Sequence, residues 1–471
     1  MPGTFFGLEI AKLALWANQR GMDVTSHNIA NANSPGYTRQ RAVIRPAHPL
    51  DVPGSGTLTG QLGTGVVVAR IAALRSAFLD RQVWNGASEL SRWTAHRQTL
   101  ERIEVIINEP TDQGIRGALD RWWEAWEVLA AEPESAAARV SLLERSETLI
   151  HVFQDVDRRL AELQEDLQVE LRQRVADVNA LAERIHGLNL QIVAAEASGQ
   201  AANDLRDQRA LAVEQLASHL GVTVVENDRG VLRVMLGGVD LVGEHGVRRL
   251  TTERTTDPGT GQTQWHVTWE ASGQRLAVGT GGIGGILDMM NREVARYRDD
   301  LLTMARVLVA EVNSRHSSGF DLDGAPGGNF FSLGPNDRLD VWTLLIDDPR
   351  AIAAAAAQAT VPGDGSNAGA LAQLRYERLA GLNDATLEDT YRSWVARLGV
   401  DSSEAQRREE HQFLLMTQIT NQRDQVAGVS LDEELAAMLT YQHAYQAAAR
   451  MVTTVDQMLD TLINRTGVVG R

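Results

Sequence analysis

A seven-residue apolar repeat close to the C-terminus is the feature that most constrains how this chain can fold. Two interleaved rows of side chains run through the stretch from Gly428 to Gly467. They are Leu431, Met438, Tyr445, Val452 and Leu459 in the first row, and Tyr441, Ala448, Val455 and Leu462 in the second. Side chains at this spacing form one stripe, which an isolated helix cannot bury. The repeat predicts an amphipathic helix that packs against a partner.

Both ends of this helix are marked in the sequence. Ser430 is a candidate N-cap, because its hydroxyl can accept a bond from a free backbone N–H group of the first turn. The acidic residues Asp432, Glu433 and Glu434 follow, and negative charge there complements the helix dipole. Gly467 is the predicted end.

A second amphipathic helix is predicted from Thr4 to Ala30. Its apolar residues recur at close to the helical period, and they are Leu8, Ala11, Leu15, Met22 and Ile29. Asn31, Asn33 and Ser34-Pro35-Gly36 then end it, since proline lacks an amide donor and glycine favours a turn. We expect Tyr37–Arg45 to be extended, residues 46–65 to form a long loop, and Val66–Val68 to form a strand.

Helix-forming segments dominate the middle of the chain. The predicted helices are residues 71–108, a stretch from Asp112 through Trp122, Trp123 and Trp126, residues 203–219 with Asn203 as cap, residues 285–316, and residues 368–425 with a break at 382–386. Residues 135–197 are expected to form one very long helix or two nearly continuous ones. Thr and Val residues alternate between 222 and 278, which is typical of strands, and Trp265, Val267 and Trp269 would share one strand face.

The expected fold is therefore mainly α with an inserted small β domain. We expect terminal helices that form a coiled coil, a long-helix bundle inside them, and a β domain nested innermost. The terminal pair is predicted to comprise residues 1–84 and 428–471, and the β domain residues 222–282. The bundle is predicted to comprise residues 85–221 and 283–427, with a loop and strand segment at 319–350.

Composition narrows the classes of function. The chain of 471 residues has 43% hydrophobic and 23% charged residues, which fits a soluble globular protein of several domains. We expect no membrane insertion and no cleaved signal peptide. A net charge of −16 argues against a nucleic-acid partner, and the absence of cysteine excludes disulfides. Residues 1–84 carry a net charge of +4, so the excess of acid lies in the rest of the chain.

One motif imitates a nucleotide-binding loop. Gly279, Gly281 and Gly284 match the GxGxxG pattern between a predicted strand and a predicted helix. A dinucleotide site also needs a following parallel strand that ends in an acidic residue, whereas Asp299 and Asp300 lie on the predicted helix. We interpret the glycines as a flexible exit from the β domain, and a nucleotide-dependent enzyme that uses Gly279–Gly284 is the weakest alternative.

Other candidate sites have simpler interpretations. Asp321-Leu-Asp323-Gly324 resembles the start of a calcium loop, but Ser332 stands where the bidentate Glu would be, so a turn is the better interpretation. The three tryptophans at 122, 123 and 126 fit helix packing better than a ligand platform. The eleven histidines show no metal-ligand spacing. We therefore predict no catalytic residue, no cofactor and no metal.

The two ends of the chain resemble the bacterial flagellar axial proteins, the rod, hook and hook-associated group. The resemblance is carried by Ser26–Gln40, which reads SHNIANANSPGYTRQ, and by Gly428–Glu434 with Tyr441-Gln442 and Ala444–Ala447. The Pro-Gly-Tyr-Thr-Arg-Gln ending is closer to hook-associated members at the hook–filament junction than to the hook subunit. Leu188–Ile192, Asn203–Arg209 and Ser318–Leu322 are also similar to the junction members, although Arg206 and Ala210 depart from their pattern.

This resemblance implies a non-enzymatic structural subunit that joins hook to filament in the extracellular flagellum. It implies export in an unfolded state through the type III apparatus, and polymerisation through paired N- and C-terminal helices. The implied partners are further copies of the chain, the hook subunit, a second hook-associated protein on the filament side, and an export chaperone. A hook or rod axial subunit is the alternative within the same class.

The resemblance also implies which residues form the assembly interfaces. The N-terminal set is Leu8, Leu15, Met22, Asn28, Ile29, Asn31, Pro35, Gly36 and Tyr37. The C-terminal set, which would also bind the chaperone, is Leu431, Leu435, Met438, Tyr441, Tyr445, Ala448, Val452, Val455, Leu459 and Leu462.

Overall fold

The computed structural model describes residues 5–52, 60–108, 113–197, 199–256, 263–334 and 338–465. The chain is mainly helical with small antiparallel sheets, which confirms the predicted fold class. It divides into two compact units. Unit 1 comprises Met1–Ser88, Asp177–Arg249 and Phe413–Arg471, and unit 2 comprises Glu89–Ala176 and Leu250–Gln412.

Ten α-helices are found in the described residues. They are α1 (Phe6–Ala30), α2 (Ala77–Ile107), α3 (Ile115–Ala131), α4 (Ala136–Glu196), α5 (Asn203–His219), α6 (Gly281–Asp288), α7 (Ala295–Ser318), α8 (Ser366–Gln373), α9 (Leu387–Ala427) and α10 (Leu431–Asp460). A π-helical turn, Met289–Val294, links α6 to α7, and a second one, Thr461–Arg465, follows α10. None of the helices described has the combination of length and apolar character needed to cross a bilayer.

The strands form five small sheets rather than one. They are β1 (Gln40–Pro46), β2 (Leu50–Val52), β3 (Gly60–Leu62), β4 (Val66–Ala73), β5 (Thr223–Glu226), β6 (Leu232–Leu236), β7 (Val239–Val242), β8 (Leu250–Thr256), β9 (Thr263–Trp269), β10 (Phe331–Ser332) and β11 (Thr343–Leu344). The pairs are β1–β4, β2–β3, β8–β9 and β10–β11, and the three-stranded sheet has the order β5-β6-β7; every pair is antiparallel.

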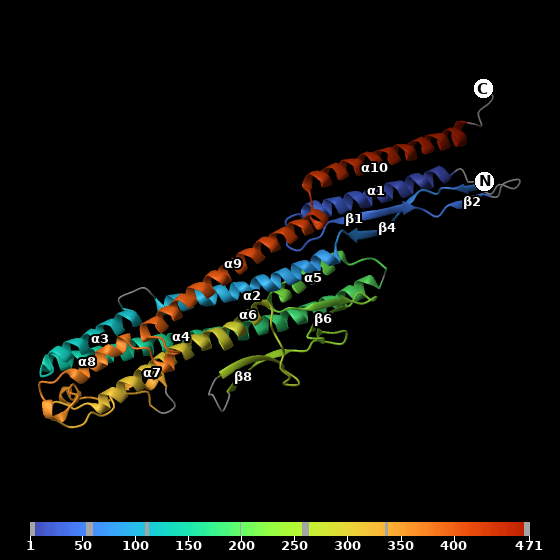
Figure 1. Ribbon diagram of the computed structural model, residues 1–471. Coiled ribbons are helices and arrows are strands. Elements are labelled where there is room, and N and C mark those ends of the chain that lie inside the picture. The colour runs from blue at the N-terminus through green and yellow to red at the C-terminus, as the bar shows by residue number, and fades with distance from the viewer. Residues whose placement is uncertain are drawn as a thin grey trace. The chain divides into compact units, whose positions relative to one another are not determined.

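The terminal helices α1 and α10 pack side by side in unit 1 (Figure 1), which confirms the predicted pairing. Two contacts define how they run. Asn28 lies against Glu434, and the backbone of Gly21 lies so close to Tyr441 that a Cβ atom at position 21 would be 2.6 Å from the ring. From the first contact to the second, the residue number falls along α1 and rises along α10, so the two helices are antiparallel. The predicted cap is also confirmed, since the side chain of Ser430 accepts a bond from Glu433 N.

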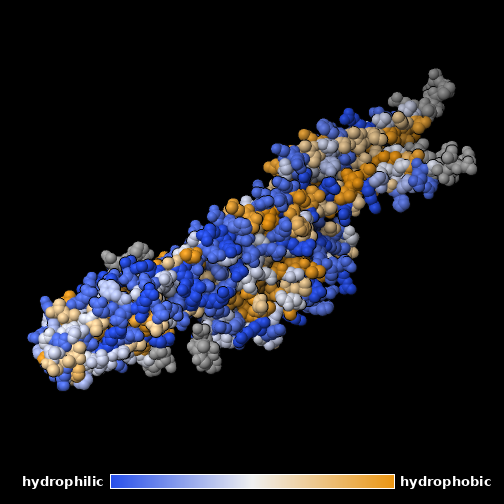
Figure 2. Space-filling model, in the orientation of Figure 1, coloured by the Kyte–Doolittle hydropathy of each residue, from blue (hydrophilic) through white to orange (hydrophobic). Residues whose placement is uncertain are grey.

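The buried side of α1 matches the predicted stripe at Ala11 but differs from it at the larger residues. Leu8, Leu15, Met22 and Ile29 are only half-buried. The buried residues are Ala11, Ala17, Gly21, Val24, Thr25 and Asn28. The reason is that α1 contacts β1 and β4 as well as α10, so small side chains occupy the closest contacts. Figure 2 shows apolar side chains that remain on the surface along α1 and α10.

The core of unit 2 is an aromatic cluster. Trp122, Trp123 and Trp126 of α3 are buried, as the packing interpretation predicted. The ring centroids of Trp126 and Phe330 are 5.3 Å apart, and those of Phe331 and Trp342 are 5.5 Å apart. Trp122 Nε1 donates to Ser146 Oγ at 2.8 Å. Buried aromatic rings of this size contribute large apolar surfaces to a core, so the packing interpretation of the three tryptophans is confirmed.

The glycine-rich segment is not a flexible exit, so that interpretation was wrong. Gly281, Gly284 and Gly285 belong to α6 and are buried. A Cβ atom at Gly285 would lie 2.6 Å from the carbonyl oxygen of Arg92 in α2. The glycines therefore allow the backbones of α6 and α2 to approach closely. The described sheets contain no parallel pair, so the nucleotide interpretation lacks its required strand.

The calcium-like segment forms a turn, as predicted. Asp321 Oδ1 accepts bonds from the backbone N–H groups of Asp323 and Ala325, at 2.9 and 2.8 Å. Gly324 has a φ of +80°, a left-handed conformation that suits glycine. The carboxylate of Asp321 is thus used by the local backbone, and Asp323 pairs with Arg350.

Several predicted boundaries were wrong. The strand expected at Val66–Val68 extends to Ala73, so the helix expected from Ile71 begins at Ala77. The segment expected to be a loop contains the β2–β3 pair. Asn203 is the first residue of α5 and does not cap it. The predicted helix start at Asp112 and helix end at Gly467 lie outside the described residues.

Candidate assembly site at the terminal motifs

The side chain of Asn28 holds the N-terminal motif together. Asn28 is 1% exposed, and its Oδ1 accepts bonds from Gln40 N at 2.9 Å and from Tyr37 Oη at 2.7 Å. Its Nδ2 donates to Gln40 O and to Glu434 Oε2, both at 2.9 Å. All four bonds of the amide are thus made, and one of them reaches the opposite end of the chain.

Arg39 forms the second link between the two ends. Its Nε donates to Glu434 Oε1 and its Nη1 to Glu433 Oε2, each at 2.6 Å. Its backbone N–H donates to the carbonyl oxygen of Ala427, the last residue of α9, at 2.8 Å. Glu434 is 2% exposed, and a buried carboxylate requires this kind of paired, hydrogen-bonded surrounding. The two motifs therefore form one polar junction, which we name the terminal junction: Asn28, Tyr37, Arg39, Gln40 and Glu434.

The start of α5 completes the terminal junction from a third part of the chain. Asp207 Oδ2 accepts from Thr38 N at 2.8 Å, and Asp204 Oδ1 accepts from Gln40 Nε2 at 2.8 Å. Asn203 Nδ2 donates to Gln40 Oε1 and to Ile71 O of β4, at 3.2 and 3.1 Å. This use of the amide explains why Asn203 does not cap its own helix.

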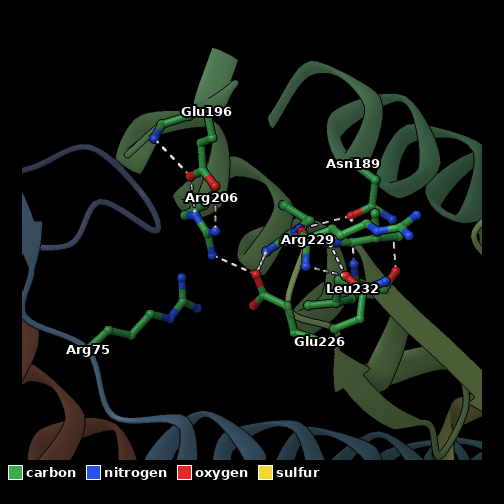
Figure 3. A network of polar contacts seen from close by, with 12 residues as sticks. Arg75, Asn189, Glu196, Arg206, Glu226, Arg229 and Leu232 are labelled. Atoms are coloured by element: carbon green, nitrogen blue, oxygen red, sulfur yellow. Dashed lines mark hydrogen bonds and ion pairs between the residues drawn. The ribbon is translucent and has the colours of Figure 1, made fainter. Parts of the chain in front are cut away.

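The remaining polar residues of the Asn203–Arg209 motif join α5 to α4 and to the β5–β6 sheet (Figure 3). Arg206 pairs with Glu196 and Glu226, both at 2.6 Å. Arg209 donates to Asn189 Oδ1 at 2.9 Å and to Gly230 O at 2.6 Å. The side-chain amide of Asn189 donates to Leu232 O of β6 and accepts from Leu232 N. Arg206, which departs from the family pattern, thus has two carboxylate partners in this chain.

Protonation states follow from this geometry. Burial raises the pKa of the Tyr37 phenol, and the carboxylates of Asp204, Asp207 and Glu434 raise it further, so the phenol stays protonated and donates to Asn28. Burial also raises the pKa of Asp207, which the bond from Thr38 N and the charge of Arg75 oppose. The bond from Arg206 lowers the pKa of Glu196 to about 2, so that pair is charged at neutral pH.

The predicted assembly residues fall into three environments. Asn28 is buried, and Asn31 and Tyr37 are half-buried beside it, while Pro35 and Gly36 are exposed in the turn. Gly36 has a φ of +76°, which favours glycine. The residues of α10 that face α1 are half-buried, apart from the buried Ala448, and they are Met438, Tyr441, Ala448, Val452, Val455 and Leu459. The predicted residues that stay exposed are Leu431, Leu435, Tyr445 and Leu462.

Sequence reasoning missed four further apolar residues on this surface. Leu439, Met451, Met458 and Ile463 are exposed, with Met458 at 60% and Ile463 at 75%. They lie outside the seven-residue repeat, on the flanks of the stripe that faces α1. A count of apolar residues around the whole helix, instead of along one stripe, would have found them. The described residues contain no group of three or more His, Asp or Glu side chains that could hold a metal ion.

Comparison with known proteins gives three family matches. Residues 8–38 match the flagella basal body rod protein model, and residues 421–465 match the flagellar basal body rod FlgEFG protein C-terminal model. Residues 100–331 match the flagellar hook-associated protein FlgK helical domain. The first two matches cover the segments that meet in the terminal junction, and the third covers much of the helical middle.

Similar proteins and a solved structure agree with these matches. The chain is 29% identical to flagellar hook-associated protein 1 of Bacillus subtilis, over 100% of both chains. It is 24% identical to flagellar hook-associated protein 1 of Salmonella typhimurium, over 96% of this chain and 98% of the relative. The structure of the flagellar hook junction protein FlgK from Burkholderia pseudomallei superimposes with a TM-score of 0.65 at 17% identity, over 74% of this chain and 100% of that one.

The shared terminal segments place the chain in the class of flagellar rod and hook axial proteins. Within that class the helical middle and the full-length relatives decide the family: the chain belongs to the flagellar hook-associated protein 1 (FlgK) family. This is a family of structural, non-enzymatic subunits of the hook–filament junction in the extracellular flagellum. The hook or rod subunit and the nucleotide-dependent enzyme are thereby excluded as its function.

Proposed function

We propose that this chain joins hook to filament by packing its α1–α10 pair against the same pair of neighbouring subunits. One observation supports the proposal most directly. After α10 has packed on α1, large apolar side chains still face solvent, with Leu435 at 51% and Leu439 at 56% exposure. Contiguous exposed apolar surface of this kind is typical of an interaction site.

The energetics favour assembly over an isolated pair. Burial of a large apolar side chain contributes about 1.5–3 kcal/mol, so covering the exposed half of six such residues would contribute roughly 5–9 kcal/mol before ordering costs. The terminal junction joins α10 to α1 through the bond between Asn28 and Glu434, and Arg39 holds the same carboxylate. The apolar surface is therefore presented in a defined arrangement, which reduces the entropy lost on association.

A pair of aspartates on the exposed side of α10 tests this proposal. Leu435→Asp with Leu439→Asp should leave unfolding by urea close to that of the wild type, because both side chains are exposed. In a deletion strain the variant should give hooks without filaments under negative-stain microscopy, since charges would be buried in the assembled interface.

The matched control is Val105→Asp with Val169→Asp, two exposed valines on α2 and α4. This control adds the same charge away from the terminal pair, and we expect filaments of normal length. Normal filaments in the strain with Leu435→Asp and Leu439→Asp would contradict the proposal, as would an equal loss of filaments in the control strain.

We further propose that the chain is exported unfolded and that an export chaperone covers α10 before secretion. The support is the same exposed apolar surface, which would otherwise favour aggregation in the cytosol. A pull-down from cytosol should retain the chaperone with the full chain and lose it when residues 428–471 are removed. Retention by the truncated chain would contradict this part.

The hook subunit and a second hook-associated protein on the filament side are the proposed neighbours. Their contacts are expected to involve the same terminal pair, because terminal segments of this kind match models shared with rod proteins. Crosslinking from position 458, on the exposed side of α10, should give adducts with both neighbours in isolated flagella. Adducts with neither neighbour would contradict the assignment.

A further inference from the structure

A pocket of about 870 Å³ lies in unit 1, beside the terminal junction but separate from the exposed side of α10. Its walls come from β4, the start of α2, the start of α5 and strand β5. Figure 3 looks into this region, where the side chains of Arg75 and Arg206 point toward each other from opposite sides. Neither the family match nor the proposed packing of α10 assigns a role to this pocket.

The pocket is rich in guanidinium groups. Five arginines line it: Arg70, Arg75, Arg81, Arg206 and Arg209. Three of them are already paired, Arg75 with Asp80 and Asp207, Arg206 with Glu196 and Glu226, and Arg209 with Glu226. The other two, Arg70 and Arg81, are exposed and have no carboxylate partner among the residues that the structure describes.

Two more arginines extend the positive surface along the β1–β4 ribbon. Strand pairing places Arg70 opposite Val43, and Arg41 and Arg45 stand two residues to either side of Val43 on β1. Alternation along a strand brings these side chains to one face. Both Arg41 and Arg45 are exposed and, like Arg70, lack a carboxylate partner in the described part of the chain. Arginine suits this role because its planar group binds carboxylates in a bidentate manner.

The rest of the pocket suits an extended peptide. Its apolar lining includes Ala72, Trp84 and Val224. One wall is β5, which is the edge strand of the β5-β6-β7 sheet, and its Val225 is 48% exposed. An edge strand presents unpaired backbone N–H and C=O groups, which can bind a further extended segment.

We propose that this pocket binds an extended acidic segment of a second copy of the chain. Charge complementarity favours a second copy, because the chain has a net charge of −16, while residues 1–84, which carry five of these seven arginines, have a net charge of +4. The location also favours it, since β4 packs directly against α1 of the proposed assembly element. The carboxylates of the bound segment pair with Arg70 and Arg81, and its backbone lies along β5.

This inference rests on the proposed function, since it describes how neighbouring subunits meet, but it can fail by itself. A photo-crosslinking amino acid, p-benzoylphenylalanine, is placed at position 81 of the purified full chain. Irradiation of a concentrated solution should give covalent dimers, and the mapped adducts should lie on an acidic segment of the second copy. The same amino acid at position 184, an exposed arginine of α4 outside the pocket, serves as control.

Charge reversal provides a second measurement. Arg70→Glu with Arg81→Glu should weaken self-association in sedimentation velocity by about two- to twenty-fivefold in low salt, because each exposed charge pair contributes a factor of about 1.4 to five. Arg184→Glu with Arg248→Glu makes the same change of charge at exposed arginines outside the pocket and should have less effect. High salt should reduce the difference between the two variants.

The pocket proposal and the proposed packing of the α1–α10 pair can fail independently of each other. Dimer yield at position 81 no higher than at position 184, adducts outside acidic segments, or equal association of the two charge-reversed variants would each overturn the pocket proposal. None of these measurements uses the variant Leu435→Asp with Leu439→Asp. That variant tests the proposed function, through filament formation in the deletion strain. A pocket variant that associates normally while the α10 variant loses filaments would leave only the terminal pair as an assembly element.

Discussion

At the scale of single residues, Glu434 shows how the ends of the chain recognise each other. Its side chain is only 3% exposed, yet it accepts bonds from Asn28 and Arg39, residues more than 390 positions away in sequence. Glu433, its neighbour, also pairs with Arg39 but is 64% exposed. The two adjacent carboxylates make similar contacts with Arg39 but differ in burial, so water screens only the ion pair of the exposed Glu433.

We expect Glu434→Gln to destabilise unit 1 by about 3 kcal/mol, since it removes the buried carboxylate of Arg39 and leaves only the exposed carboxylate of Glu433 as a charged partner. Glu433→Gln should cost less than about 1 kcal/mol, as is usual for exposed ion pairs. Urea unfolding measures both, and hydrogen exchange should show faster exchange in α1 and α10 for Glu434→Gln. Equal effects of the two substitutions would show that burial of Glu434 is unimportant.

His316 makes stability depend on pH in unit 2. The ring is buried, its Nδ1 lies 2.7 Å from Gly328 O, and its Nε2 accepts from Ala353 N at 2.9 Å. Burial lowers the pKa of His316 in the folded chain. The unfolded chain, with a pKa near 6.5, therefore binds the proton first. The stabilisation is complete above about pH 6.5 and is lost as the pH falls toward the folded pKa, by up to about 1.4 kcal/mol per pH unit.

His316→Gln tests this pH dependence, because glutamine can still accept the bond from Ala353 N but does not titrate. Between pH 6.5 and pH 5 the free energy of unfolding should fall less steeply for this variant than for the wild type. His151→Gln, at an exposed position of α4, should keep the wild-type slope. The hypothesis fails if His316→Gln shows the same slope as the wild type.

At the scale of elements, much of the helical order could be predicted from sequence. Residues 135–197, expected to form one very long helix or two nearly continuous ones, form the single helix α4 (Ala136–Glu196), and the helix expected at 203–219 is α5. These predictions depend on local properties, namely helix formers without breakers, so they need no knowledge of the fold. Ser430 was identified as a cap for the same reason, since its partner Glu433 is three residues away.

Features that depend on tertiary contacts could not be predicted. The apolar repeat of α1 indicated Leu8, Leu15 and Met22, but these are only half-buried, and the buried positions are those of smaller residues such as Ala17 and Gly21, where α1 contacts α10, β1 and β4. The amide of Asn203 could cap α5 but binds Gln40 instead. The contacts that join Asn28, Arg39 and Glu434 could likewise not be predicted, because the spacing of these three residues along the chain matches no known motif of contact.

Gly21 makes the packing of α1 on α10 testable at this scale. A Cβ atom there would lie 2.6 Å from the ring of Tyr441, whereas a Cβ atom at Gly7, in the same helix, would meet nothing within 4 Å. Gly21→Ala should destabilise the pair by about 1–3 kcal/mol through overpacking. Gly7→Ala should be neutral or stabilising by up to about 1 kcal/mol, from its better helix propensity.

Urea unfolding and hydrogen exchange in α10 measure the two glycine variants. The faster exchange should be confined to the Gly21→Ala variant. Equal stability of the two variants would mean that Tyr441 moves aside at little cost, and the close approach of α1 and α10 would then contribute nothing to their pairing.

At the scale of the whole molecule, the chain has two compact units with separate cores. Unit 1 contains the terminal junction, and its stability depends on buried polar contacts such as that of Glu434. Unit 2 depends on aromatic packing around Trp122 and Phe331. The segments that match rod proteins belong to unit 1, so the part shared across the axial class carries the polar junction.

Separate cores predict that substitutions in the two units act independently. Ser146→Ala removes the hydroxyl that accepts the bond from the buried Trp122 N–H group, so it should destabilise unit 2 by about 1–3 kcal/mol. Combined with Glu434→Gln, the two changes in the free energy of unfolding should add to within about 0.5 kcal/mol, as is usual for sites that share no partner. Hydrogen exchange should rise in α1 and α10 for one substitution and in α3 and α4 for the other. A coupling energy well above 0.5 kcal/mol, or exchange that rises in both units for either single variant, would show instead that the units unfold as one.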